Sequence, residues 1–370
     1  MKINPVLWAL VTAVVLLVAM LAGCEGPAGP AGAAGQNGQT LAFNLEGYAP
    51  GIQCATCHSP DSDSTYHVAG RERQWSLSTH AIGGNVSRNN TPCSGCHTTE
   101  GFLQRMNGQA VTDQLNPTPP GCFTCHAPHA RGNFTLRDTV PVTLISNING
   151  VADAQFNYGH GNMCVQCHQP RVLATKMDGA ADSLVITTNR WYSHYGVQGQ
   201  MLMGEGGFKF PGYTYSGNSN HTSNTTIQQE GCPVCHMAEH LGVPQAGGHT
   251  MNIFYTGTGG VETPLLDGCN QAGCHTSPTM TAATIAATQE HVQDSLHALR
   301  LLLAARGWLD TTSTEDLAKL TSGRLVITPA VKAGALYNYF FVTHDLSMGI
   351  HNTKYANDLL STSLAVLRAP

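Results

Sequence analysis

Charged side chains are scarce in this 370-residue chain. Asp, Glu, Lys and Arg make up 11% of the residues, where about 25% is usual for a soluble domain. The net charge is −5, so the chain lacks the basic surplus that binds a phosphate backbone, and we expect no nucleic-acid partner. Glycine and proline are abundant instead, at 40 and 19 residues. Few charges and many loop formers suit a chain wrapped around large apolar groups that themselves provide the core.

One short motif dominates what the sequence does contain. Cys-x-x-Cys-His occurs five times, and a variant with four residues between the cysteines occurs once. The histidines that end the six copies are His58, His97, His126, His168, His236 and His275. Random placement gives roughly 0.02 exact copies in a chain of this composition, so five copies indicate a repeated site.

The motif is the attachment signature of c-type haem. Two thioethers hold the porphyrin, and the adjacent histidine binds the iron. The twelve cysteines are Cys54, Cys57, Cys93, Cys96, Cys122, Cys125, Cys164, Cys167, Cys232, Cys235, Cys269 and Cys274. A zinc ribbon gives no reason for a histidine after every second cysteine, and a disulfide framework leaves the histidines without a role. We therefore expect six covalently bound haem c groups.

The thirteenth cysteine, Cys24, indicates a location. Lys2 precedes an apolar run over residues 5–22, and the run ends in Leu-Ala-Gly-Cys, which looks like a bacterial lipobox. Cleavage would remove residues 1–23 as a lipoprotein signal peptide and leave Cys24 acylated; the alternative is an uncleaved transmembrane anchor. Glu25 follows instead of aspartate, which favours the outer membrane. We expect a lipid-anchored protein of the cell envelope outside the cytoplasm, on the periplasmic or cell-surface face.

The rest of the chain divides into three regions. Residues 24–45 hold the lipid anchor and five Gly-X-Y triplets, which we interpret as an extended tether rather than a triple helix. Residues 46–278 form the hexahaem region, where scattered Gly, Asn, Ser and Pro predict short helices around the motifs, long loops and little sheet. Residues 279–370 are expected to form a helical region. The predicted fold class is mainly α with extensive loops, a multihaem cytochrome c fold with C-terminal packing helices.

Three helices are predicted in the C-terminal region. The first carries an apolar stripe formed by Ile285, Val292, Leu296, Leu299 and Leu303. The second is predicted to start at Thr328-Pro329, as N-cap and first-turn proline, and to end near residue 342. The third is predicted from about residue 353 to 367, with its apolar side formed by Ala356, Leu359, Leu360, Leu364 and Leu367. These helices are expected to pack together. Their outer surface is also a candidate contact for a homodimer or a filament.

Each of six irons needs a second ligand, and twelve histidines lie outside the motifs. Methionine ligation would raise the reduction potential, but the spare histidines make bis-histidine ligation the simpler interpretation. The distal candidates, chosen by turn or aromatic context, are His80, His129, His194, His221, His249 and His351. Reserve candidates are His67, His160, His240 and His344. His291 and His297 lie on the first predicted C-terminal helix and are expected at its surface.

The order of motifs over residues 75–367 resembles the ammonia-forming cytochrome c nitrite reductases and their octahaem relatives. The resemblance rests on His80 ahead of a haem triplet, on the run His194…His221…Cys232-Pro-Val-Cys-His-Met…His249, and on the Gly-Ile-His351-Asn turn before a last helix. The motif at Cys54 would be an additional N-terminal haem.

This resemblance implies crossed ligand pairs. The implied pairs are His80 with His168, His249 with His126, His351 with His236, and His221 with His275. His129 and His194 are then left for the haems of His58 and His97, in an order that the sequence leaves open.

The departures from that family decide the functional expectation. Its catalytic haem has a lysine in place of the motif histidine, and the matching residue here is His97. Arg88 and His194 match two of its active-site residues, but Arg171 lies in the segment where its tyrosine would be sought. An iron with two imidazole ligands has no vacant position for substrate, so the sequence predicts an electron carrier without catalytic residues.

The expected role is electron relay in anaerobic respiration or extracellular electron transfer, with other cytochromes, redox proteins or an oxidised mineral as partners. One alternative is a reductase of nitrite, hydroxylamine or a sulfur oxyanion, in which His194 and Arg88 face substrate at the haem of His97. Another alternative is a structural haem filament.

Overall fold

Short helices and loops make up most of the chain. A computed structural model describes residues 54–369, apart from residues 57, 60, 62, 83 and 218. The predicted signal peptide, Cys24, the Gly-X-Y tether and Cys57 lie outside the described residues. Within the described part, no helix is both long and apolar enough to cross a lipid bilayer.

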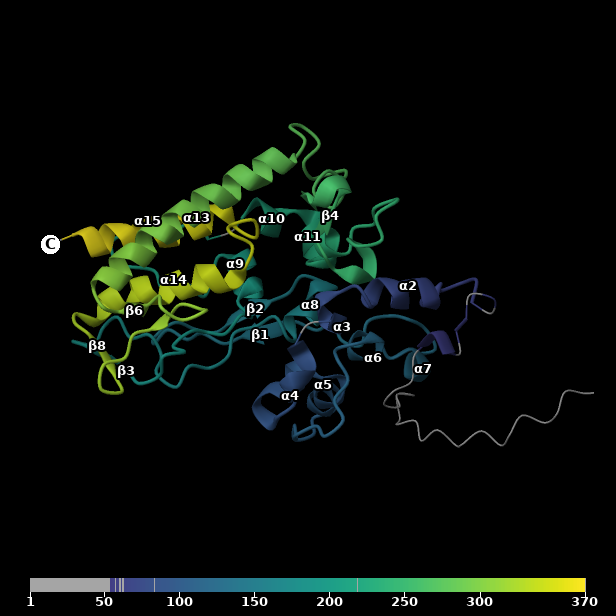
Figure 1. The fold of residues 1–370 in the computed structure, drawn as a ribbon, viewed down its shortest axis with the longest axis horizontal. Coiled ribbons are helices and arrows are strands. Elements are labelled where there is room, and N and C mark those ends of the chain that lie inside the picture. The colour runs from purple at the N-terminus through teal and green to yellow at the C-terminus, as the bar shows by residue number, and fades with distance from the viewer. Residues whose placement is uncertain are drawn as a thin grey trace, which may run out of the picture. The chain divides into compact units, whose positions relative to one another are not determined.

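Helices occur along the whole described chain, and only three exceed eight residues (Figure 1). The α-helices are α2 (Val68–Trp75), α3 (Thr79–Ile82), α4 (Thr91–His97), α5 (Thr99–Met106), α6 (Cys122–Cys125), α7 (Pro128–Arg131), α8 (Gly161–Val165), α9 (Gln198–Met203), α10 (Asn220–Ser223), α11 (Thr225–Glu230), α12 (Pro233–His236), α13 (Ala282–Ala305), α14 (Ala333–Asp345) and α15 (Thr353–Arg368). The 3₁₀ turns are η1 (Cys54–Thr56), η2 (Gly84–Ser87), η3 (Gly248–Thr250), η4 (Thr258–Gly260) and η5 (Ala330–Lys332).

In the part of the chain that the structure describes, sheet is confined to two-stranded antiparallel pairs of very short strands. The strands are β1 (Val142–Leu144), β2 (Ala154–Phe156), β3 (Leu184–Ile186), β4 (Phe254–Thr256), β5 (Glu262–Pro264), β6 (Leu309–Asp310), β7 (Leu317–Ala318) and β8 (Leu325–Ile327). The pairs are β1–β2, β3–β8, β4–β5 and β6–β7. This content confirms the prediction of short helices, long loops and little sheet.

Motif cysteines sit in short helical turns at η1, α4, α6, α8 and α12. A turn of helix brings two cysteines three residues apart onto one side, with the following histidine at the end of the turn. The variant motif at Cys269 lies in consecutive turns without a helix. Its four intervening residues exceed the spacing that places two side chains on one helical face.

The first and third C-terminal helices agree with the sequence. The buried residues of α13 are the five of the predicted stripe, Ile285, Val292, Leu296, Leu299 and Leu303. On α15, Ala356, Leu359, Leu360 and Leu367 are buried and Leu364 is half-buried. Asn352 caps α15 by accepting a hydrogen bond from the backbone N–H of Tyr355 at 3.1 Å.

The predicted start of the second helix was wrong. Pro329 has an extended backbone, with ψ at 154°, so it cannot serve as the first residue of a helix. A 3₁₀ turn, η5, intervenes and α14 begins at Ala333. Nearly every residue of α14 is buried, and a helix that is apolar all round lacks the stripe from which its start could be located.

Helices α13, α14 and α15 contact one another and lie away from α2–α7 (Figure 1). They share one hydrophobic core with residues 148–210, including Trp191 and Phe208. Asn338 of α14 ties the two stretches together, because its side chain bonds both the N–H and the C=O of Phe208, at 2.7 and 2.9 Å. The division between residues 278 and 279 remains a prediction.

Leu299 tests the contribution of this core to stability. Leu299→Ala removes a fully buried side chain and should lower the free energy of unfolding by about 2–5 kcal/mol. Leu301→Ala on the same helix, where the side chain is 55% exposed, should change it by less than about 0.5 kcal/mol. Denaturant unfolding followed by far-UV circular dichroism measures both variants, and equal losses would contradict the assignment of the buried face.

Candidate metal centres

Hydrogen bonds fix the motif helices in place. The side chain of Arg137 is buried and donates to the C=O of Phe123 at 2.6 Å and to the C=O of His126 at 2.8 Å, which anchors both ends of the turn α6. Asp113 accepts hydrogen bonds from the N–H and hydroxyl of Thr91, each at 2.6 Å, at the start of α4. These bonds fix the turns that carry His97 and His126.

The structure places each motif histidine opposite one histidine from outside the motifs, at nearly the same distance in all six pairs. The pairs, with the distances between ring centroids, are His58–His129 at 6.5 Å, His80–His168 at 6.1 Å, His97–His194 at 6.2 Å, His126–His249 at 6.3 Å, His221–His275 at 6.2 Å and His236–His351 at 6.3 Å. The six partners are the six distal candidates of the sequence. The order that the sequence left open is His129 opposite His58 and His194 opposite His97.

The spacing of these pairs suits one metal ion between two imidazoles. A metal–nitrogen bond of about 2.0 Å on each side, plus the distance from each nitrogen to its ring centre, separates the centroids by roughly 6 Å. Other ring pairs range from 4.2 Å, for His344 and Tyr195, to 6.4 Å, for Tyr337 and Phe341. The distance gains its meaning from the fact that every motif histidine has another histidine at this spacing. Among the described residues, no group of three or more His, Cys, Asp or Glu side chains gathers to hold a metal ion. Each candidate centre offers a pair of imidazoles, the donor set of a bis-histidine haem iron.

A cavity lies beside one member of the pair His126–His249, although His126 is not among the residues that line it. A cavity of about 340 Å³ opens beside His249, between α2 and η3, with Arg71 and Gln74 on its wall. Two imidazoles at metal spacing, with two motif cysteines beside one of them, fit a covalently attached haem.

Burial keeps most of these imidazoles neutral. Desolvation lowers the pKa of His80 to about 4, and it lowers the pKa of His249 to about 4 with a smaller contribution from Arg71. Burial also lowers the pKa of His168 and of His236. A neutral imidazole is the form that binds a metal ion, so these sites are ready for ligation without losing a proton.

Motif cysteines from different motifs lie near one another. The thiols of Cys54 and Cys122, of Cys96 and Cys167, and of Cys164 and Cys232 are close enough to shift each other's pKa. Interactions at longer range link Cys125 to Cys164, and Cys235 to Cys269 and Cys274. The attachment points therefore follow an order of neighbours that differs from the order of the motifs in the sequence.

Glycine allows one of these close approaches. A Cβ on Gly159 would lie 1.5 Å from the C=O oxygen of Gln229, and a Cβ on Gly161 would lie 3.0 Å from the backbone nitrogen of Cys232. Gly159 also has a positive φ of 50°. Only glycine fits here, and the result is that α8, with Cys164, rests on the segment that carries Cys232.

Positive charge surrounds the pair His97–His194. Burial lowers the pKa of His97, and the guanidinium groups of Arg88 and Arg171 lower it further. The pKa of His194 falls to about 4, again through burial first and then Arg171. His194 also has a left-handed backbone, with φ at 71°, which is uncommon for a residue with a side chain.

Three of the four reserve histidines have other contacts, and His67 lines the cavity beside His249. His160 bonds Glu230 at 2.5 Å, and His240 bonds Asp267 at 2.6 Å. His344 is buried against the rings of Tyr192 and Tyr195. His291 and His297 are exposed on α13, as predicted.

Sequence reasoning missed the polar residues that hold the ligand candidates. Gln198 lies 3.4 Å from Nδ1 of His168, and Asp345 accepts a hydrogen bond from Nδ1 of His351 at 2.7 Å. Asp345 precedes His351 by six residues, across a turn, and no helical or strand spacing would have linked the two residues in advance.

Comparison with known proteins shows a likeness in fold. No family model matches the chain, and no curated protein matches it. One solved structure, described as the "Crystal Structure of Outer Cell Wall Cytochrome OcwA", is similar with a TM-score of 0.51 and 19% sequence identity. The match covers 88% of this chain and 59% of that one, so the chain spans less than two thirds of the matched cytochrome. At this identity the likeness shows the fold alone, and it confirms the predicted fold class, a mainly helical, loop-rich cytochrome fold.

His344 gives a prediction about acid stability. Burial lowers its pKa to about 4 in the folded chain, whereas an unfolded histidine binds its proton near pH 6.5. Acidification from pH 6.5 to about 4 therefore favours the unfolded state, by roughly 1–3 kcal/mol. His344→Phe keeps an aromatic ring in place but cannot bind a proton. The midpoint of thermal unfolding should therefore fall less between pH 6.5 and pH 4 in this variant than in the wild type. His297→Phe on the exposed face of α13 is the control, and the same flattening there would contradict the role of burial.

Proposed function

We propose that this protein is a six-haem c-type cytochrome that transfers electrons. One observation carries the proposal: each of the six motif histidines faces a histidine from elsewhere in the chain, at the spacing that a shared metal ion requires. The likeness in fold to an outer cell wall cytochrome supports it.

The proposed ligands divide the work between local and distant segments. The motif cysteines hold each haem covalently, and the motif histidines bind one side of the iron. The other side is bound by the paired histidine of each site. These pairs, motif histidine first, are His58 with His129, His97 with His194, His126 with His249, His168 with His80, His236 with His351, and His275 with His221. Haem iron held this way gains or loses one electron without binding substrate. The protein supplies fixed spacing, exclusion of water and control of the potentials.

The proximity of cysteines from different motifs supports a branched path. The neighbours run from the haem of His58 to those of His126, His168, His236 and His275, through Cys54–Cys122, Cys125–Cys164, Cys164–Cys232 and Cys235–Cys269. The haem of His97 joins at that of His168, through Cys96 and Cys167. Electrons entering at His275 would thus have two exits, at His58 and at His97.

The proposed location is the cell envelope outside the cytoplasm. The lipobox at Cys24 supports a lipid anchor, with the outer membrane as its site, and the Gly-X-Y segment would separate the haem region from the lipid. Partners are then other cytochromes or redox proteins, or an oxidised mineral, in anaerobic respiration or extracellular electron transfer.

A second candidate is a reductase acting at the haem of His97. The guanidinium groups near this pair, Arg88 and Arg171, would attract an oxyanion such as nitrite. Against it, His194 lies at the same spacing from His97 as the other partners lie from their motif histidines. Cyanide binding decides between the two: the electron carrier should bind none at neutral pH, and uptake of one equivalent would favour the reductase.

Removal of one distal ligand tests the bis-histidine assignment. The purified protein should carry six haems by mass and by pyridine haemochrome, all of them low-spin. His249→Ala should convert one of the six to a high-spin haem that binds carbon monoxide or cyanide.

His240→Ala is the matched control, because His240 bonds Asp267 and stacks on Tyr255. It should leave all six haems low-spin. A colourless wild-type protein would overturn the proposed function, and a high-spin haem in both variants would overturn the assignment of His249.

A further inference from the structure

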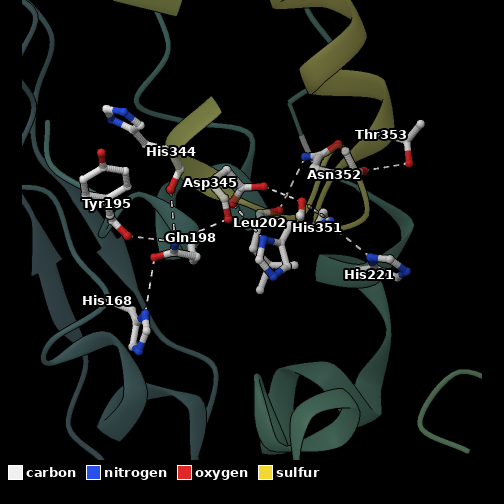
Figure 2. Close-up of polar contacts among 12 residues, drawn as sticks. His168, Tyr195, Gln198, Leu202, His221, His344, Asp345, His351, Asn352 and Thr353 are labelled. Atoms are coloured by element: carbon white, nitrogen blue, oxygen red, sulfur yellow. Dashed lines mark hydrogen bonds and ion pairs between the residues drawn. The ribbon is translucent and has the colours of Figure 1, made fainter. Parts of the chain in front are cut away.

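The turn between α14 and α15 is bonded to histidines of three proposed haems (Figure 2). Nδ1 of His351 donates to Asp345 Oδ1 at 2.7 Å, and Nδ1 of His221 lies 3.2 Å from the C=O oxygen of His351. Gln198 lies 3.4 Å from Nδ1 of His168 and donates to the C=O of Asp345 at 3.3 Å. A single short segment therefore orients ligands of the haems of His168, His236 and His275.

The carboxylate of Asp345 is the distinctive group in this segment. Its side chain has no exposed surface, and its second oxygen accepts a hydrogen bond from the hydroxyl of Ser347. A buried negative charge acts through a low effective dielectric, so its influence on a nearby iron is stronger than that of a surface carboxylate.

In three nearby histidines of the proposed haem sites, Nδ1 bonds an uncharged oxygen. The acceptor is the C=O of Met251 for His236 at 3.1 Å, the C=O of His351 for His221 at 3.2 Å, and the side-chain amide of Gln198 for His168 at 3.4 Å. The bond from His351 to Asp345 is shorter than these three, and its acceptor is charged. Hydrogen bonds to an ionised acceptor are about twice as strong as those between neutral groups.

A carboxylate that draws the Nδ1 proton makes the imidazole a stronger electron donor to the metal. A stronger donor and a nearby negative charge both favour ferric over ferrous iron, so the reduction potential falls. We propose that Asp345 is a positioning residue that holds His351 and keeps the haem of His236 harder to reduce than the neighbouring haems of His168 and His275. This inference rests on the proposed function.

Potentiometric titration of the six-haem protein tests the role of Asp345. Asp345→Asn keeps the size of the side chain and an oxygen that accepts from His351, but it removes the charge. One of the six one-electron steps should move at least tenfold in favour of the ferrous form, which is about 59 mV upward, while the others stay in place. Asp345→Glu restores the charge and should return that step toward its wild-type potential.

Asp267→Asn is the matched control. It removes a carboxylate that bonds a histidine at 2.6 Å, but that histidine, His240, faces the ring of Tyr255 rather than a motif histidine. The Asp267 side chain is 45% exposed, so solvent screens its charge and any shift should be much smaller than that of Asp345→Asn. An unchanged titration of Asp345→Asn, or an equal shift in the control, would overturn the inference.

Spectra of the unmodified protein provide a test that does not depend on how the variants fold. One of its low-spin haems should show, by electron paramagnetic resonance, the smaller g anisotropy of an iron with an imidazolate-like ligand. Six signals of ordinary bis-imidazole type would overturn the inference and leave the proposed function intact, whereas a protein without haem would overturn the proposed function itself.

Discussion

The separation between paired imidazoles is the constraint on which the rest of the structure depends. Six pairs of histidines stand 6.1–6.5 Å apart, ring centre to ring centre. Within each pair one residue is fixed by a local turn of backbone, and the other comes from a distant part of the chain. Twelve side chains from different parts of the chain must reach this spacing. Loops, close glycine contacts and buried polar anchors such as Arg137 make this possible.

The distribution of apolar side chains fits this constraint. Helices α13–α15 and residues 148–210 share one extensive hydrophobic core. By contrast, the cluster beneath α5 and α6 contains only Leu103 and Phe123 as buried members among the described residues. The motif-rich part of the chain therefore has little core of its own, and in the proposed function the haem groups supply it.

Charged residues outside the motifs can give chemically similar centres different reduction potentials. All six proposed irons have the same ligand type, so ligand identity alone would give them similar potentials. The buried carboxylate of Asp345 beside His351, and the guanidinium groups of Arg88 and Arg171 beside His97, place opposite charges at two of the centres. Negative charge favours ferric iron and positive charge favours ferrous iron, so these groups can set a direction for electron flow through chemically equivalent sites.

The sequence by itself determined everything that depends on local spacing. The motif histidines, the buried stripe of α13 and the apolar side of α15 follow from periods of three to seven residues, which the backbone enforces. The fold decided the rest: that His129 lies opposite His58 and His194 opposite His97, that Cys96 lies near Cys167, and that Asp345 reaches His351 across a turn. These contacts join segments whose separation along the chain carries no periodic signal, so only the packed structure can specify them. The start of α14 was mispredicted for a related reason, because a helix buried on all sides has no polar face to mark its ends.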